Sequence, residues 1–321
     1  MIKQTLRVVA LLLLLYFSLS AMAADSPQDM LAAGRVDDAL AALNQRVASN
    51  PKDAEAFNLL CRAYFQYEDW DRAESRCKRA TEIDPNNSRF HRWMGRVYGE
   101  KAGRANIWSA AALAGKTRDE FQRAAQLDPR DADALVDVAE YYLEAPGIMG
   151  GGNDKAREQA KVLGRVSPAQ EHWVYARIAE KNKDFGAAER EYRQMIEVAK
   201  GEAEAWLNMA FFYRNRKRYD EMEQAFVRMN QAPMPHREVL VEAANSLFRT
   251  GRAFSFAIEL LRRYFSDGPV EEAPAFKAHN LLGQILETRG DKTDAAVEYR
   301  ACLALARNFG PCRQGLKRVA P

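Results

Sequence analysis

The sequence has few of the residues from which metal sites and catalytic centres are built. Its 321 residues include only four histidines and four cysteines. It contains no HExxH motif and no paired Cys/His spacing of the kind that holds zinc. Nothing marks a nucleophile with a base and an orienting partner. We therefore expect no metal ion, no cofactor and no enzymatic activity.

An excess of charge of one sign is also missing. Lysine and arginine number 47 against 44 aspartates and glutamates, a formal net charge of +3. So small an excess exerts little overall attraction on nucleic acid or on an anionic membrane. The chain also lacks a linker rich in proline, glycine or serine. We expect one elongated domain and no nucleic-acid partner.

Long apolar runs are confined to the N-terminus. Lys3 and Arg7 precede an apolar run from Val8 to Leu19, and Ala21-Met22-Ala23 supplies the small residues of a signal-peptidase site. This order predicts a secretory signal at residues 1–23, whose removal lowers the net charge to +1. The run is shorter than the ~20 residues needed to span a bilayer, which disfavours an uncleaved anchor.

No cysteine lies at the predicted cleavage site, so nothing indicates a lipoprotein. We expect a periplasmic or secreted protein that starts at Ala24 and has no stable membrane insertion after cleavage.

A repeated unit follows this segment. Residues 54–87 form a window of 34 residues that places Phe57 and Tyr64 on a first helix and Ala73 on a second, with Pro85 as the stop. This spacing resembles the tetratricopeptide repeat. The resemblance implies an all-α, right-handed superhelical solenoid of antiparallel helix pairs, which presents a binding surface to another protein.

The same frame covers most of residues 24–321. The predicted units are 26–53 (truncated), 54–87, 88–131 (with an insertion), 132–168 (with a glycine-rich loop), 169–202, 203–237, 238–275 and 276–309. A polar-faced capping helix at 310–321 is expected to cover the open end of the solenoid. Residues 266–274 are interpreted as a longer turn between the last two full units. Two units have weaker substitutes, Met222 and Thr117, at the tight helix crossing. Most of the others have alanine there: Ala39, Ala73, Ala156, Ala188, Ala257 and Ala295.

Three of the four histidines occupy the fourth position of their units, where an aromatic side chain usually packs: His91, His172 and His279. At least one helix pair separates these units, so the three imidazoles cannot converge on one ion. We interpret them as packing substitutes for tryptophan.

The four cysteines form two local pairs. Cys61 and Cys77 lie at positions that an antiparallel helix pair brings together, and Cys302 and Cys312 flank a single turn. Disulfides persist in the oxidising compartment to which a secretory signal leads. We predict Cys61–Cys77 and Cys302–Cys312 bridges that staple the two ends of the array. The alternative is that all four are small buried apolar residues.

Two segments break the 34-residue period. Between Tyr98 and Phe121 there are ten extra residues, which are expected to lengthen the helices of the third unit. Ile107 and Trp108 in this insertion are either an exposed partner contact or packed on the neighbouring repeat.

The second break is the APGIMGGGND segment of the fourth unit. Pro146 and four glycines exclude a helix there. Together with the insertion, this loop resembles that of uncharacterised exported bacterial tetratricopeptide proteins. One interpretation is structural, with Ile148 and Met149 tucked against adjacent helices. The other is a small-ligand or anion site made by the N–H groups of the loop: Gly147, Gly150, Gly151, Gly152 and Asn153.

A partner groove is expected on the concave side, where first-helix residues of successive units face inward. Arginine can hold carboxylates there by two hydrogen bonds, and an aromatic side chain can anchor a partner. The alternative is a solvated charged face. The candidate residues are Asn58, Arg62, Phe65, Arg89, Arg92, Arg96, Trp173, Arg177, Phe211 and Arg214.

The sequence therefore predicts a non-catalytic, exported scaffold that binds a protein or peptide of unknown identity in this groove. The alternative function is small-ligand or anion binding at the glycine-rich loop.

Overall fold

The computed structural model describes residues 25–319, so the predicted signal at 1–23 lies outside the described residues. The described part is all-α, with seventeen α-helices, one 3₁₀-helix and no strand. The first helices are α2 (Pro27–Ala32), α3 (Val36–Ser49), α4 (Ala54–Gln66), α5 (Trp70–Ile83), α6 (Ser88–Arg104), α7 (Ile107–Leu127), α8 (Ala132–Glu144), η1 (Gly147–Met149) and α9 (Asn153–Leu163). The others are α10 (Pro168–Lys181), α11 (Phe185–Val198), α12 (Ala203–Asn215), α13 (Tyr219–Gln231), α14 (Glu238–Thr250), α15 (Phe254–Asp267), α16 (Ala275–Arg289), α17 (Lys292–Leu305) and α18 (Gly310–Val319).

Local sequence sets the ends of these helices. The side chains of Asp53, Asp69 and Asp184 each accept a hydrogen bond from a backbone N–H in the first turn of α4, α5 and α11. Such caps satisfy donors that have no partner inside the helix. The residues predicted at the tight helix crossings are all buried, which confirms that prediction: Ala39, Ala73, Ala156, Ala188, Ala257, Ala295, Met222 and Thr117.

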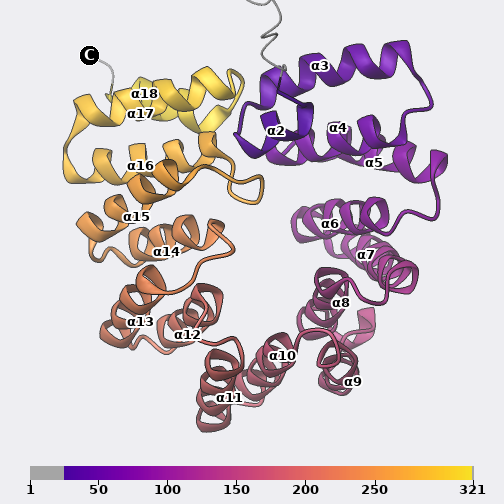
Figure 1. The fold of residues 1–321 in the computed structure, drawn as a ribbon, viewed down its shortest axis with the longest axis vertical. Coiled ribbons are helices and arrows are strands. Elements are labelled where there is room, and N and C mark those ends of the chain that lie inside the picture. Colours follow the sequence, from indigo (N-terminus) through magenta and orange to yellow (C-terminus); the bar gives the residue numbers. More distant parts are fainter. Residues whose placement is uncertain (1–24, 320–321) are drawn as a thin grey trace, which may run out of the picture.

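The array of helix pairs bends until its two ends meet, so the molecule is a closed ring (Figure 1). Helix α3 contacts α17, and α18 packs on α16 and α17. Asp37 of α3 accepts hydrogen bonds from the backbone N–H and the Nε of Arg307, at 2.9 and 3.1 Å. Helix α18 covers the last repeat as expected for the capping helix, but the C-terminal end of the array is not open, because α17 and Arg307 also contact α3.

A glycine lies at this junction because two backbones approach closely there. Gly34 has a φ of +72°, and a Cβ added to it would lie 2.5 Å from the backbone nitrogen of Ala275. No other residue type fits both the conformation and the space. We name the contact of α2–α4 with residues 270–277 and 307 the seam.

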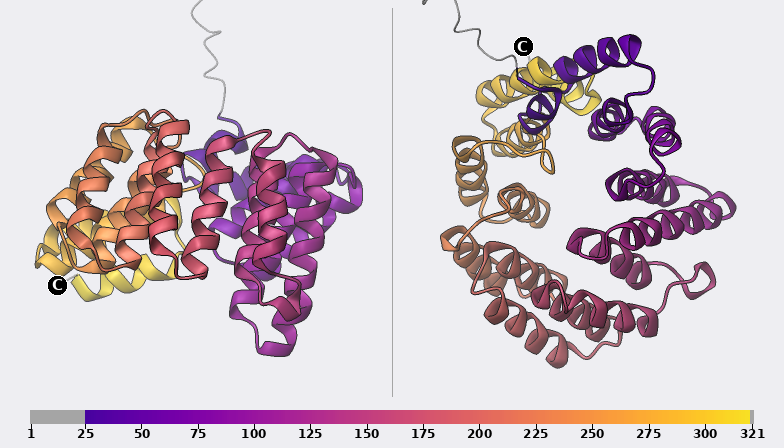
Figure 2. Two further views of the ribbon diagram at one scale, coloured as in Figure 1. Left: turned by 90° about the horizontal axis from the view of Figure 1, so that it is seen from below. Right: turned by 45° about the vertical axis from the view of Figure 1, so that its right-hand side comes forward.

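The insertion of the third unit lengthens both of its helices. Helix α6 has 17 residues and α7 has 21, compared with 13 in α4 and 14 in α5. The α6–α7 hairpin projects beyond the neighbouring repeats on one side of the ring (Figure 2). Ile107 and Trp108 are 73% and 85% exposed at its tip. They are therefore exposed rather than packed on the neighbouring repeat.

The glycine-rich loop folds tightly against its own repeat. Met149 packs on the cluster of Ala114, Phe121, Val138 and Tyr141, whereas Ile148 is 97% exposed. The structural interpretation therefore holds for Met149 and is wrong for Ile148.

Both cysteine pairs are disulfides in the structure, with Cα–Cα distances of 5.1 Å for Cys61–Cys77 and 6.4 Å for Cys302–Cys312. This agrees with the predicted pairings. None of the described helices is both long and apolar enough to cross a membrane.

Candidate functional site

The ring encloses a cavity of about 880 Å³. The first helix of successive repeats lines it, and Figure 1 shows α6, α8, α10 and α12 on the inner side of the ring with α7, α9, α11 and α13 outside. Because every repeat contributes the same helix face, positions that recur at the repeat period converge on one volume. Six of the ten predicted groove residues line this cavity: Arg62, Arg89, Arg92, Arg96, Trp173 and Phe211.

The other four predicted groove residues have different surroundings. Asn58 is fully buried. Phe65 packs edge-on against Trp70 and Trp93, with ring centroids 5.1 and 5.3 Å away. Arg177 donates to Glu144 at 2.5 Å, and the guanidinium of Arg214 lies 4.6 Å from the ring centroid of Phe211.

Each cavity arginine on α4 and α6 is paired with a carboxylate of this chain. Arg92 contacts Asp133 and Asp137, both at 2.8 Å, and Arg96 lies 3.6 Å from Asp137. Arg89 pairs with Glu55, and Arg62 with Glu271. The guanidiniums of Arg62 and Arg96 lie 5.5 and 5.1 Å from the ring centroid of Trp93. A carboxylate from a partner therefore has to compete with carboxylates already in place.

The opposite wall of the cavity is acidic. Glu204 of α12, Glu238 and Glu242 of α14, and Glu272 after α15 all line it. Among residues 25–319, the one basic group beside these carboxylates is the imidazole of His236, whose Nδ1 lies 3.4 Å from Oε1 of Glu238. The protein around the cavity displaces water from Glu242, and this effect, with the carboxylates of Glu238 and Glu204, raises the pKa of Glu242 to about 7. The cavity thus has a basic but paired wall and an acidic wall of mutually repelling groups.

Sequence reasoning missed this acidic wall, although its own frame contains the signal. Glu204 and Glu242 occupy the second and fifth positions of their units, which are among the positions expected to face inward. Acidic side chains at inward positions also occur on solvated repeat faces, so their sequence positions alone do not distinguish a cavity wall from an exposed surface.

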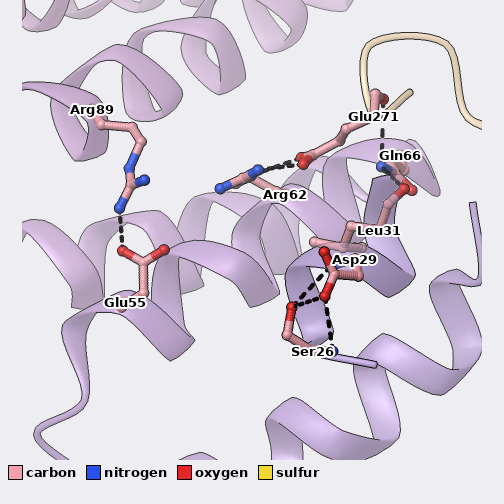
Figure 3. A network of polar contacts seen from close by, with 8 residues as sticks. All are labelled: Ser26, Asp29, Leu31, Glu55, Arg62, Gln66, Arg89 and Glu271. Atoms are coloured by element: carbon pink, nitrogen blue, oxygen red, sulfur yellow. Dashed lines mark hydrogen bonds and ion pairs between the residues drawn. The ribbon is translucent and has the colours of Figure 1, made fainter. Parts of the chain in front are cut away.

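The seam closes one end of the cavity with a buried ion pair. Arg62 of α4 donates from Nε to Oε1 of Glu271 at 2.7 Å, and its Nη2 contacts Oε2. Gln66, one turn further along the same helix, points to the backbone of Glu271 (Figure 3). Residues 62 and 271 are far apart in the sequence, so only the closed ring brings them together.

The glycine-rich loop uses its own N–H groups internally. The backbone N–H groups of Gly150, Gly151 and Gly152 donate to Gly147, Pro146 and Tyr142, at 2.9, 3.2 and 2.8 Å. Gly151 is required because a Cβ there would lie 1.8 Å from the carbonyl oxygen of Ala145. An anion at this loop would have to displace these bonds. The side chain of Asn153 donates to Asn182 at 2.9 Å.

The three histidines at the fourth position each meet a glutamate of their own repeat. The Nδ1 atoms of His91, His172 and His279 lie 2.6, 2.8 and 2.6 Å from Glu120, Glu191 and Glu298. The hydrogen bond to Glu120 raises the pKa of His91. His279 also stacks on Phe265, with ring centroids 4.2 Å apart. In the part of the chain that the structure describes, no group of three or more His, Cys, Asp or Glu side chains is placed to hold a metal ion.

Comparison with known proteins agrees with this architecture. Two family models for the tetratricopeptide repeat match residues 30–97 and 241–308. The fold is similar to that of yeast Tom70, with a TM-score of 0.53 and 15% identity over 88% of this chain and 58% of Tom70.

Similarity is weaker to two bacterial proteins. A thermophilic tetratricopeptide protein of Thermus thermophilus has a TM-score of 0.47 and 18% identity over 58% of this chain and 98% of its own. A tetratricopeptide protein from Parabacteroides merdae has a TM-score of 0.40 and 18% identity over 84% of this chain and 99% of its own. None of the curated proteins matches the chain. The two family matches therefore show that the chain contains tetratricopeptide repeats at residues 30–97 and 241–308, within an array of helix pairs.

Proposed function

We propose that this protein is an exported, non-catalytic scaffold that holds a segment of another protein in the central cavity. The observation that carries this proposal is the cavity itself, in which anchors for a polypeptide come from successive inner helices. Trp93 and Phe211 offer aromatic surface, and Gln170 and Asn208 offer amide groups for hydrogen bonds.

The size of the cavity limits the kind of occupant. Its volume of about 880 Å³ lies within the range of roughly 300–1,000 Å³ that ligand pockets occupy. A folded domain is far larger, whereas an extended segment or a chain end fits. The closed ring also requires the occupant to enter along the ring axis or through an opening of the seam.

Export is supported by the predicted signal and by the two disulfides, which persist in an oxidising compartment. N-terminal sequencing of the protein from expressing cells is expected to find Ala24 as the first residue. A soluble product that still begins with Met1 would contradict export.

The cavity is tested by filling it. Val136 of α8 lines the cavity, so Val136→Trp adds an indole where the partner segment is proposed to lie. The matched control is Val227→Trp on the outer helix α13, where the valine is 44% exposed. Arg92 and Arg96 are poor choices for this test, because both approach Asp137 and their replacement alters stability as well.

The measurement is recovery of a partner from periplasmic extract under mild cross-linking. Wild type and Val227→Trp are expected to recover the same protein, and Val136→Trp is expected to lose it. Equal recovery by Val136→Trp, with unchanged helix content, would place the partner elsewhere and refute binding in the cavity.

A further inference from the structure

One face of α4 carries three polar side chains in line. Asn58, Arg62 and Gln66 are four residues apart, so they lie one above another on the same side of the helix. They are 0%, 7% and 4% exposed in the closed ring. An amide, a guanidinium and a second amide in this order can bond a peptide backbone on either side of a carboxylate.

The loop between α15 and α16 covers the part of this face that carries Arg62 and Gln66, as a short peptide would. We name residues 268–274 the strap. Its Glu271 carboxylate meets the Arg62 guanidinium through two nitrogens, and its Glu271 carbonyl accepts from Gln66 at 3.5 Å. Tyr264 holds the strap from the other side, with the backbone N–H of Val270 donating to its hydroxyl at 2.8 Å.

The polar face is incompletely bonded in the closed ring. Five buried side-chain nitrogen and oxygen atoms in the described residues have no hydrogen-bond partner, and four of them belong to this face: Asn58 Nδ2, Asn58 Oδ1, Arg62 Nη1 and Gln66 Oε1. Buried polar groups are almost always paired, and an unpaired one opposes the conformation that buries it. In Figure 3, one end of the Arg62 guanidinium faces away from Glu271, toward the side where Arg89 lies.

From these contacts we propose that the strap is a displaceable internal occupant of a peptide site on α4, and that an acidic extended segment of the partner takes its place. This inference rests on the proposed function and names the chemistry of its ligand. Displacement opens the seam and lets the ligand satisfy polar atoms of this face that have no partner in the closed ring.

The charge of this wall favours an acidic ligand once Glu271 has left. Arg62 is then without its carboxylate, while Arg89, Arg92 and Arg96 keep theirs. The wall gains one net positive charge next to the unpaired amides. Glu204, Glu238 and Glu242 on the opposite wall repel the same ligand toward α4.

The other ion pairs of the seam are compatible with opening because at least one partner of each is exposed. Lys277 and Glu68 are 2.9 Å apart with side chains that are 33% and 46% exposed, and Arg307 is largely exposed beside Asp37. Exposed pairs of this kind contribute little to stability. Among the polar contacts of the seam, the buried one at Arg62 is therefore the main one that a ligand has to replace.

The test uses a labelled synthetic peptide with the strap sequence SDGPVEEAPA, residues 266–275, capped at both ends. Binding to the full mature chain is measured by fluorescence anisotropy. In wild type the strap occupies the α4 site, and the apparent affinity for the peptide is reduced in proportion to the fraction of molecules whose site is free. Glu271→Gln weakens the binding of the strap and raises that fraction. This variant is therefore expected to bind the peptide at least about tenfold more tightly than wild type. A peptide with glutamine at the position of Glu271 is expected to lose this binding.

Two further variants keep the test valid if Glu271→Gln folds poorly. Arg307→Gln weakens the seam without touching α4, and it is expected to tighten peptide binding in the same direction. The matched control, Arg318→Gln, removes a pair with Glu287 inside the C-terminal repeat and is expected to leave affinity at the wild-type value. Adding Arg62→Met to the Glu271→Gln chain is expected to abolish binding.

Equal affinity of wild type, Glu271→Gln and Arg307→Gln for the strap peptide would overturn the proposal, as would equal binding of the glutamine peptide. If Val136→Trp still loses the natural partner in that case, the cavity function stands and only the strap inference fails. If Val136→Trp keeps its partner while the strap peptide binds as expected, the α4 site stands and the cavity proposal fails.

Discussion

The buried pair of Arg62 and Glu271 is expected to dominate the stability of the seam. Its side chains are 8% and 7% exposed, so Glu271→Met leaves the Arg62 guanidinium buried without a counter-charge. Breaking a buried pair in this way costs about 3–5 kcal/mol. Arg62→Met with Glu271→Met removes both charges, and such replacement of a pair by apolar residues is often close to neutral. We expect a coupling energy of roughly 2 kcal/mol or more in the double-mutant cycle.

The assay is urea unfolding followed by circular dichroism, together with the radius of gyration from small-angle X-ray scattering. If Glu271→Met opens the seam, water reaches Arg62, so the loss of stability falls below this range and the radius of gyration rises. Lys277→Met is the control at the same seam, because its pair with Glu68 is exposed and is worth less than about 1 kcal/mol. If Glu271→Met lowers the free energy of unfolding no more than Lys277→Met does, and leaves the radius of gyration unchanged, the idea of a closed ring held by this pair is refuted.

Three further predictions concern the titration of His91 and Glu242 and the disulfide bond between Cys61 and Cys77. Glu120 raises the pKa of His91, so the protonated imidazole stabilises the folded state below pH 6.5, and this stabilisation is lost as the pH rises through the pKa of His91 in the folded protein. In thermal unfolding, His91→Gln should lower the free energy of unfolding by about 1–2 kcal/mol at pH 5.5 and by less at pH 9. Because the pKa of Glu242 is raised in the folded state, ionisation of its carboxyl group lowers the free energy of unfolding. This loss grows from pH 4.5 to about 7 and is complete above about pH 7. Glu242→Gln should therefore add about 1 kcal/mol at pH 8 and nothing at pH 4; this value is reduced because the side chain, although surrounded by the cavity wall, is still reached by water. Replacing Cys61 and Cys77 by alanine should cost roughly 3 kcal/mol, as for a 15-residue loop, and free thiols in unreduced digests of wild type would contradict the bridge.

The repeat-level features were accessible from sequence because they depend on residues close together in the chain. The 34-residue period placed Ala73 and Ala188 at tight crossings, and both are fully buried. The cysteine pairs were predictable for the same reason, since sequence separations of 16 and 10 keep each pair within one helix hairpin or one turn. The inward positions of a first helix follow from helical geometry, so most predicted groove residues line the cavity.

The state of those groove residues was not accessible in the same way. Arg92 was interpreted as able to hold a partner's carboxylate, but Asp133 and Asp137 of the next repeat already contact it. Pairing across repeats depends on the angle between neighbouring helix hairpins, which no local pattern specifies. The exposure of Ile148 beside the packed Met149 has the same origin, because it depends on the φ of +92° at Gly150 and on the path of the whole loop.

The sequence by itself determined the helix pairs, their order, the projecting insertion and the residues that face inward, because each depends on contacts within about one repeat. Only the tertiary structure decided that the array closes into a ring, that Arg62 meets Glu271 and that a basic wall faces an acidic one. Closure results from small rotations between neighbouring repeats that add up over the whole array. A modest change in any of those rotations would leave every helix folded but would separate the two ends of the array.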